Sequence, residues 1–269
     1  MTVIYDSDNQ KSSFIEEIKE IFYYRFFLSN LISRDLAVRY KRTALGFIWS
    51  FLNPLLMMAV LTLAFTNIYG RTEDRATYIL AGIIVFGMFN KGVSDAMGSI
   101  VLNSNVLTNI YVPSSIFVLS SIISEFVDYF FSILVLLIMS LILGIKISLA
   151  WFFIIPISIF LLIFTLGVGL LLSSFAVFFM DLRSIWQIVM RAFYFITPVM
   201  FTVDLYPKLI RDFQKFNPIS IYMTMFRSAF YGNVIGSKEM FIMGAIALST
   251  FAIGWVVFNK LSYRFPYYI

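Results

Sequence analysis

Few residue types are available for chemistry in this chain. Its 269 residues include no cysteine and no histidine, which removes the commonest nucleophile and base and the main soft ligands for zinc, copper and iron. Any reaction would have to rely on carboxylates, hydroxyls, lysine and arginine. We find no cluster of these that indicates a catalytic centre, so the sequence predicts no catalytic residue, no metal and no cofactor of its own.

Several charged residues lie inside long apolar runs, and three of them could pair between two helices. Glu125 and Asp128 are three positions apart, so on a helix they share a face, and Arg191 lies in a later run. If both runs start on the same side of a membrane, Glu125 lies about 16 Å and Arg191 about 12 Å along their helices. Because an unpaired intramembrane charge is costly, we expect Arg191 to pair with Glu125 or Asp128. A proton or ion relay is the alternative use of these charges.

A second group of charges, Arg39, Lys41 and Arg42, comes just before the first apolar run. Basic clusters beside a membrane span attract anionic headgroups, at about 1 kcal/mol per charge. The cluster is therefore expected at least to anchor and orient the chain.

The composition explains why these charges stand out. The chain is 60% hydrophobic and only 13% charged, it carries 31 Phe, 15 Tyr and 4 Trp, and its mean hydropathy is +0.88. Soluble domains hold about 25% charged residues, and disordered chains are poor in apolar and aromatic residues. The sequence therefore predicts an integral membrane protein. Its net charge of +5 bears on orientation and anionic lipid, and no nucleic-acid motif accompanies it.

The apolar runs predict an all-α fold with six transmembrane helices. A span needs about 20 apolar residues, and six runs qualify: 47–69, 77–99, 114–144, 149–179, 183–203 and 240–259. Residues 1–46 are predicted to be a cytoplasmic segment, and residues 47–269 the transmembrane domain. Seven cations before the first span place both termini in the cytoplasm, although the basic residues of segment 204–239 run against a strict positive-inside count.

Two shorter features complete the predicted fold. Ser13 and Glu16 form a capping box that opens an amphipathic helix on the membrane surface, with apolar residues on one face at Phe14, Ile15, Ile18, Ile21 and Phe22. Packing of this helix on a soluble domain is the alternative. In segment 204–239, Asn217-Pro218 separates two helical patterns that are too short to span, Leu205–Phe216 and Ile219–Tyr231. They predict two re-entrant helices on the outer side.

Two motifs resemble a known family. The segment from Arg34 to Pro54, RDLAVRYKRTALGFIWSFLNP, resembles the approach to the first span in ABC type-2 permeases that export polysaccharides, the O-antigen and teichoic-acid exporters. Asn217-Pro218-Ile219-Ser220, followed by Phe226-Arg227 and Gly232, is similar to the outer connector of the same family. With the six-span layout, the resemblance covers essentially the whole chain.

The resemblance implies a half-transporter of the bacterial inner membrane that is not itself an enzyme. Two copies would form the channel, and two separate ATP-binding cassette subunits would bind ATP and Mg. The substrate would be a polyprenyl-pyrophosphate-linked polysaccharide, received at the cytoplasmic mouth by Arg39, Lys41 and Arg42. The ATPase would dock on the connector between spans two and three, at Ser104, Asn105, Thr108, Asn109 and Tyr111. Relatives often carry basic residues in this connector, and this chain has none between Asn103 and Pro113.

Some aromatic residues are expected to guide the glycan, because sugar rings present apolar faces that lie well against aromatic rings. Those in the spans that resemble the channel helices are Trp49, Phe51, Phe86, Phe89, Trp186, Tyr194 and Phe201. Those expected at the outer exit are Tyr222, Phe230 and Tyr231.

Other functions remain open on the sequence alone. They are an ABC type-2 permease for teichoic acid, a smaller lipid or a drug, a membrane-embedded glycan transferase, and a carrier driven by an ion gradient. A transferase would need converging carboxylates at a membrane surface, whereas the acids expected to be embedded here are few and lie within apolar runs.

Overall fold

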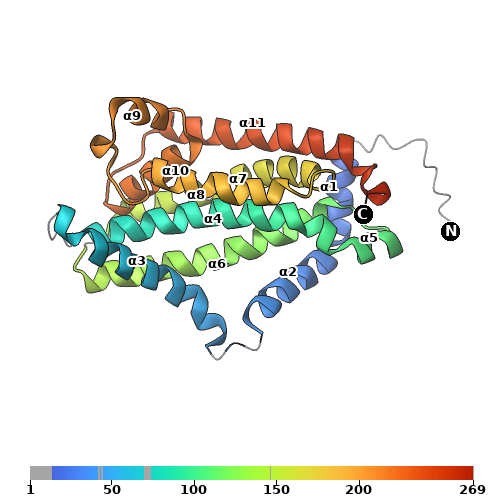
Figure 1. Ribbon diagram of the computed structural model, residues 1–269, viewed down its shortest axis with the longest axis horizontal. Helices are drawn as coiled ribbons and strands as arrows, with labels where there is room; N and C mark the ends of the chain where they lie inside the picture. Colours follow the sequence, from blue (N-terminus) through green and yellow to red (C-terminus); the bar gives the residue numbers. More distant parts are fainter. Residues whose placement is uncertain (1–13, 42, 44, 70–73, 146, 269) are drawn as a thin grey trace.

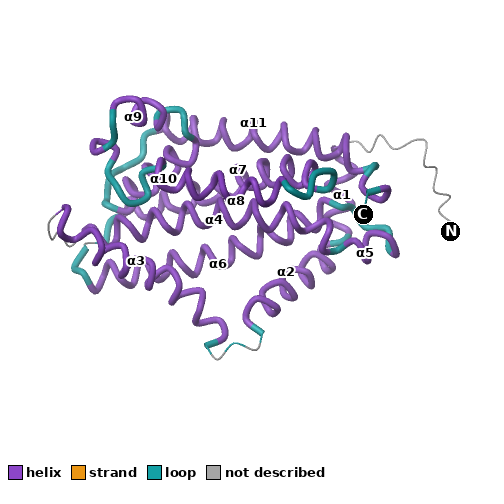
Figure 2. The backbone as a smooth tube through the Cα atoms, in the orientation of Figure 1, coloured by secondary structure: helices purple, strands orange, loops and turns teal. Residues whose placement is uncertain are grey.

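The structure is a computed structural model that describes residues 14–41, 43, 45–69, 74–145 and 147–268 (Figure 1). Within these residues every regular element is a helix and there is no strand (Figure 2). The predicted all-α fold is therefore confirmed for the described part of the chain.

Four helical segments are long and apolar enough to cross a membrane, by length and composition. They are α4 (Asp74–Leu102), α6 (Ser115–Ile142), η3 with α7 (Leu149–Phe153 and Ile154–Ala176) and α11 (Ser237–Ser262). Figure 1 shows α4, α6, α7 and α11 running along the long axis of the molecule. These helices correspond to the second, third, fourth and sixth predicted spans.

The first and fifth predicted spans correspond to α3 (Trp49–Tyr69), which follows η2 (Gly46–Ile48), and to α8 (Leu182–Ile196). Helix α8 has 15 residues and is about 22 Å long, less than the hydrocarbon thickness of about 30 Å. It ends where Thr197 is extended, at ψ 143°, because the following Pro198 disfavours a helical conformation there. The predicted fifth span, 183–203, was therefore too long.

Helices α7 and α11 pack unusually closely. A Cβ added to Gly254 of α11 would collide with the carbonyl oxygen of Gly167 in α7, and one added to Gly167 would lie 2.5 Å from the backbone nitrogen of Phe251. The two glycines therefore let the backbones of these helices touch, which is how small residues bring membrane helices together.

The N-terminal helices lie at the end of the bundle that carries α5 (Ser104–Asn109) and the C-terminal η5 (Phe265–Tyr267) (Figure 1). Helix α1 (Phe14–Tyr23) confirms the predicted helix, and Ser13 of the capping box lies outside the described residues. Glu17 is buried and accepts a hydrogen bond from Ser115 Oγ at 3.0 Å. Helix α2 (Arg25–Tyr40) then leads to the segment before α3.

Two short helices lie at the opposite end of the bundle, α9 (Lys208–Gln214), after η4 (Val203–Leu205), and α10 (Pro218–Phe230). They confirm the two helical patterns predicted on either side of Asn217-Pro218. The Asn217 side chain caps α10 by accepting from the nitrogen of Ile219 at 3.1 Å, and Pro218 fits the first turn.

Arg227 fastens α10 to the rest of the bundle. Its buried guanidinium donates to the carbonyl oxygens of Tyr78, Pro198 and Val199, at 2.8, 2.5 and 2.7 Å. It also lies 3.4 Å from the ring centroid of Tyr78. The short helix is thereby tied both to α4 and to the turn that follows α8.

Candidate functional site

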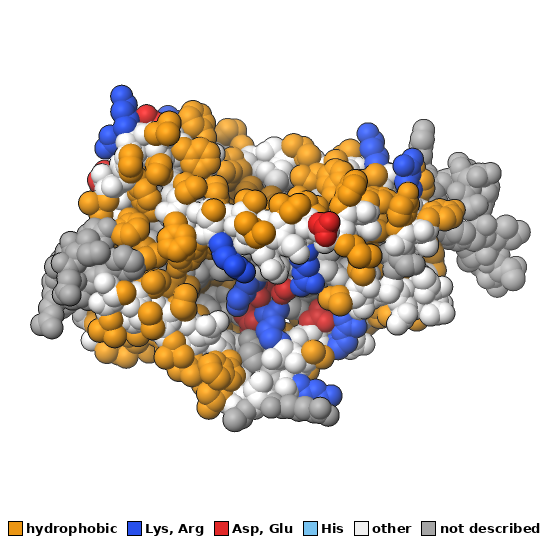
Figure 3. Space-filling view, in the orientation of Figure 1, with side chains coloured by type: hydrophobic (Ala, Val, Ile, Leu, Met, Phe, Trp, Pro, Cys, Tyr) orange, Lys and Arg blue, Asp and Glu red, His pale blue; other side chains and the backbone are white. Residues whose placement is uncertain are grey.

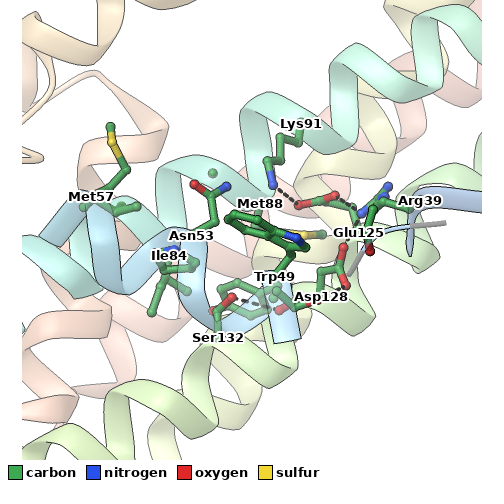
Figure 4. A pocket seen from close by; sticks show the side chains of 16 residues that line it. Arg39, Trp49, Asn53, Met57, Ile84, Met88, Lys91, Glu125, Asp128 and Ser132 are labelled. Carbon is green, nitrogen blue, oxygen red and sulfur yellow. Dashed lines mark hydrogen bonds and ion pairs between the residues drawn. The ribbon is translucent and has the colours of Figure 1, made fainter. Parts of the chain in front are cut away.

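A charged hollow lies on one face of the molecule. Figure 3 shows Lys, Arg, Asp and Glu side chains gathered in it at the centre of the view, within a surface that is otherwise largely apolar. A pocket of about 370 Å³ opens there, between the end of α2 and helices α3, α4 and α6. Figure 4 shows Arg39, Trp49, Lys91, Glu125 and Asp128 around it.

Arg39 is the centre of this cluster. Its Nη1 donates to Glu125 Oε2 at 2.7 Å and to Asp128, and its Nη2 donates to Asp95 Oδ2 at 3.1 Å. Lys91 Nζ lies 3.7 Å from Glu125 Oε1. One arginine is thus shared by carboxylates from two helices, α4 and α6. We call these five residues the Arg39 network.

Local structure explains how the network is built. Glu125 and Asp128 lie one turn apart on α6 and point the same way. Arg39 lies in the last turn of α2, which packs against α6, and its long side chain reaches inward. Burial opposes its charge, but the nearby carboxylates outweigh burial and raise the pKa of Arg39. The network therefore holds a permanent positive charge between acids and joins α2 to the spanning helices.

The predicted pairing of Arg191 with Glu125 or Asp128 is wrong. Glu125 forms ion pairs with Arg39 and Lys91, and Asp128 forms one with Arg39. Arg191 is exposed on α8 and lines a separate pocket of about 300 Å³ with Asn90, Lys91 and Asp95. Similar depth along two helices did not bring the charges together, because depth does not fix the rotation of each helix, and Arg39 from α2 pairs with both carboxylates.

The three cations predicted to receive a headgroup are not equivalent. The guanidinium of Arg39 is engaged by carboxylates, Lys41 is exposed just beyond the end of α2, and Arg42 lies outside the described residues. The predicted headgroup contact therefore remains a prediction.

The aromatic residues predicted to line the channel separate into two groups. Trp49 is 41% exposed and lines the pocket beside Arg39. Phe86 is buried, with its ring edge-on to Tyr194 at 5.1 Å, and lines the pocket beside Arg191. Phe89 is 4% exposed and is packed between Phe164 and Trp186. Phe89 therefore belongs to the core, which corrects its assignment to the channel wall.

The remaining predicted aromatics include two further corrections. Tyr222 and Phe230 are fully buried: the Tyr222 hydroxyl donates to the Met243 carbonyl at 2.8 Å, and Phe230 stacks on Trp151. They cannot form an outer surface of this chain. The other predicted aromatic residues are partly buried: Phe51, Trp186, Tyr194, Phe201 and Tyr231.

The connector predicted to dock the ATPase forms the separate helix α5 at the end of the bundle. None of its residues is buried. Asn105, Thr108, Asn109 and Tyr111 are exposed and Ser104 is half-buried. The connector is fixed to the N-terminal helices, because the Tyr24 hydroxyl donates to the Tyr111 carbonyl at 3.0 Å. The docking role itself remains a prediction.

Sequence reasoning missed Arg183, the second residue of α8. Its guanidinium lies against Gly98 of α4, where an added Cβ would lie 3.0 Å from Nη1. The available signal was a cation at the start of an apolar run.

Comparison with known proteins gives concordant similarities. The profile of the ABC-2 type transporter family matches residues 28–231. An O-antigen export system permease protein, RfbA of Klebsiella pneumoniae, is 25% identical over 237 residues, which is 87% of this chain and 92% of the relative. RfbA of Myxococcus xanthus is 26% identical over 84% of this chain and 88% of the relative. The capsule polysaccharide export inner-membrane protein CtrC of Neisseria meningitidis is 24% identical over 85% of this chain and 87% of the relative.

Proposed function

This chain belongs to the ABC-2 type transporter family, and from that premise we propose that it is the membrane permease subunit of an exporter for lipid-linked polysaccharide. The observation that carries the proposal is the extent of the similarity. Three relatives whose names specify O-antigen or capsule polysaccharide export align over more than four fifths of both chains. These names span two kinds of glycan, so the proposal is for polysaccharide export and not for a particular sugar sequence.

The proposed topology has six spans, with α9 and α10 as re-entrant helices on the outer side. Five spans are the helices α3, α4, α6, α7 and α11, and the fifth in chain order is α8 together with the apolar residues that follow it up to 203. Residues 1–46 then form a cytoplasmic and interfacial segment, and residues 47–269 the transmembrane domain. The common position of α1, α5 and η5 at one end of the bundle supports this. That end is proposed to be the cytoplasmic one, in a bacterial inner membrane.

Two copies of the chain are proposed to form the transport path. The exposed surface of α8 carries apolar residues beside Arg191. Arg191 forms no ion pair with another described residue. A charge on a spanning helix is costly against lipid, so this face favours cover by a second copy around an aqueous path. Trp49 and Tyr194 are the proposed contacts of a sugar ring along that path, and Tyr231 is the one near the outer exit.

ATP hydrolysis is proposed to occur in two separate ATP-binding cassette subunits, which hold the ATP and Mg and dock on α5. Helix α5 and the carbonyl of Tyr111 contact the N-terminal helices. The end of α2 in turn joins α4 and α6 through Arg39. A displacement of α5 by the ATPase therefore has a contiguous route to the spanning helices.

A deletion experiment tests the proposal in the cell. Loss of the gene should leave lipid-linked polysaccharide inside the inner membrane and remove the glycan from the surface, and the wild-type chain should restore it. Unchanged surface glycan in the deletion strain, with full production of the other wild-type components, would refute the proposal. Failure to make any lipid-linked glycan would instead point to a transferase.

A further inference from the structure

A second pocket, of about 480 Å³, lies next to the Arg39 network toward the α5 end. Its walls come from the last turns of α2 and α4, from the first part of α6 and from the start of α8. The charged residues that line it are Arg34, Asp35, Arg39, Asp95 and Arg183. Three arginines against two aspartates give these five side chains a net charge of +1.

The two aspartates are already engaged. Asp35 lies 2.9 Å from Arg34 Nη2, and Asp95 lies 3.1 Å from Arg39 Nη2. Arg39 is further held by Glu125 and Asp128, which line the neighbouring pocket. Arg183 is different: in the described part of the chain its Nε is buried without a hydrogen-bond partner, and its guanidinium forms no ion pair within 4 Å.

Arg183 is nevertheless held in place. Its guanidinium lies against Gly98, with Nη1 and Cζ at 3.0 and 3.2 Å from the position of an added Cβ. The nearby hydroxyls offer no free hydrogens, because Ser99, Ser121 and Ser124 each donate to a backbone carbonyl of their own helix. The N–H groups of Arg183 are therefore the chief unused donors in a preformed basic pocket.

The chemistry of the pocket selects its ligand. A guanidinium offers a planar fork of donors that matches the oxygens of a phosphoryl group, and a buried donor without a partner is costly. Basic pockets between membrane helices near the membrane surface bind phosphorylated headgroups. We propose that this pocket binds the phosphoryl group of a lipid, with Arg183 as the principal donor. The assignment of that lipid to the exported substrate rests on the proposed function.

Binding to the purified complex of permease and ATPase tests the site. The ligand used is a short-chain isoprenyl pyrophosphate in neutral detergent, measured by titration calorimetry. Arg183→Gln should weaken binding at least about tenfold, because a charge-assisted pair of hydrogen bonds is lost. Arg183→Lys should also weaken it, because lysine keeps the charge and loses the fork. The matched control is Arg264→Gln. It removes an exposed arginine that is hydrogen-bonded to Tyr263, at the same end of the bundle as the pocket.

Two outcomes would overturn the proposal. One is wild-type affinity in Arg183→Gln. The other is full affinity in Arg183→Lys, which would reduce Arg183 to a charge that balances Asp95. If Arg183→Gln fails to fold, Arg183→Lys becomes the deciding variant: it keeps the charge and loses the fork, the proposal requires weaker binding, and full affinity overturns it.

Competition identifies the source of the phosphoryl group. Displacement of the isoprenyl ligand by inorganic pyrophosphate, but not by phosphatidylglycerol, supports a substrate site, and equal displacement by both supports a phospholipid site. ATP-driven export by wild-type complex in vesicles is measured in parallel. If binding depends on Arg183 but the wild-type complex does not export, the proposed function is refuted and the site is not. If the wild-type complex exports but Arg183→Gln binds with wild-type affinity, the site is refuted and the proposed function is not.

Discussion

Arg39 Nη1 donates to Glu125 Oε2 at 2.7 Å across 86 positions of the sequence. Together with Asp95 and Asp128, this contact joins the end of α2 to α4 and α6. A helix pair that precedes the first predicted span is thereby fastened to the middle of the bundle. The relationship gives the N-terminal segment a mechanical role as well as an anchoring one.

Substitution Arg39→Gln should destabilise the protein. It leaves the buried carboxylates of Glu125 and Asp128 without their chief cation, and breaking a fully buried ion pair costs about 3–5 kcal/mol. Because the Arg39 side chain is 27% exposed, we expect a smaller loss, of about 2 kcal/mol. The thermal unfolding midpoint in detergent measures it. Lys41→Gln, at an exposed neighbouring position, is the control, and equal midpoints for the two variants would contradict the network.

Substitution Arg227→Lys should loosen α10. The guanidinium reaches the three carbonyls from three separate nitrogens, whereas the donors of lysine all lie on one nitrogen and cannot keep the same geometry. Each buried acceptor left unpaired costs about 1–3 kcal/mol. The variant should unfold at a lower temperature, and the backbone amides of α10 should exchange hydrogen faster. The same change at Arg211, which is exposed on α9, should alter neither quantity. Unchanged hydrogen exchange of the α10 amides in Arg227→Lys would show that the arginine does not hold α10 in place.

Substitution Gly254→Ala should separate α7 from α11. The added methyl group meets the carbonyl of Gly167, and backbone cannot yield as a flexible side chain can, so overpacking should cost about 1–3 kcal/mol. Gly87→Ala is the control: a Cβ there meets no atom within 4 Å, and alanine is favoured over glycine in a helix by about 0.5–1 kcal/mol. Thermal unfolding of the two variants should therefore shift in opposite directions. A shift of the same sign and size in both would contradict the close packing.

The docking of α1 should depend on pH. Burial raises the pKa of the Glu17 carboxyl, and nearby Glu20 adds to the effect, while the hydrogen bond from Ser115 opposes it. A raised pKa in the folded state means that docking is strongest when the carboxyl is protonated and weakens as pH rises through that pKa. Hydrogen exchange of residues 14–23 should therefore be slower at about pH 5 than at about pH 8, after correction for the intrinsic rate.

Glu17→Gln provides the test of that mechanism. The neutral amide keeps a hydrogen-bonding group beside Ser115 and does not ionise, so the corrected exchange of α1 should lose its pH dependence. Persistence of the same dependence in the variant would assign it to another group.

The sequence was informative wherever a local signal sets the structure. Asn217-Pro218 marks the boundary between α9 and α10, because asparagine caps a helix and proline fits its first turn. Apolar length located α4, α6, α7 and α11 within a few residues. The end of α8 was missed because apolar residues continue beyond it, while the effect of Pro198 on Thr197 stops the helix.

The candidate site was less predictable, because it depends on which way each helix faces. Depth along a helix placed Arg191 level with Glu125, but depth does not fix rotation, and the partner came from α2 outside the predicted spans. Phe89, Tyr222 and Phe230 could not be separated from exposed aromatics for a related reason. Helix α4, which carries Phe89, has too weak a periodic pattern to identify its buried face, and the pattern of α10 marks an apolar face without showing whether protein or lipid covers it.

This chain, together with its ATPase, is proposed to move lipid-linked polysaccharide across a membrane. The most direct measurement places the purified complex in vesicles with labelled lipid-linked glycan on the ATPase side and follows its appearance on the other side. The account predicts transfer with hydrolysable ATP and no transfer with a non-hydrolysable analogue. Transfer by the chain alone, without ATPase and ATP, would contradict it.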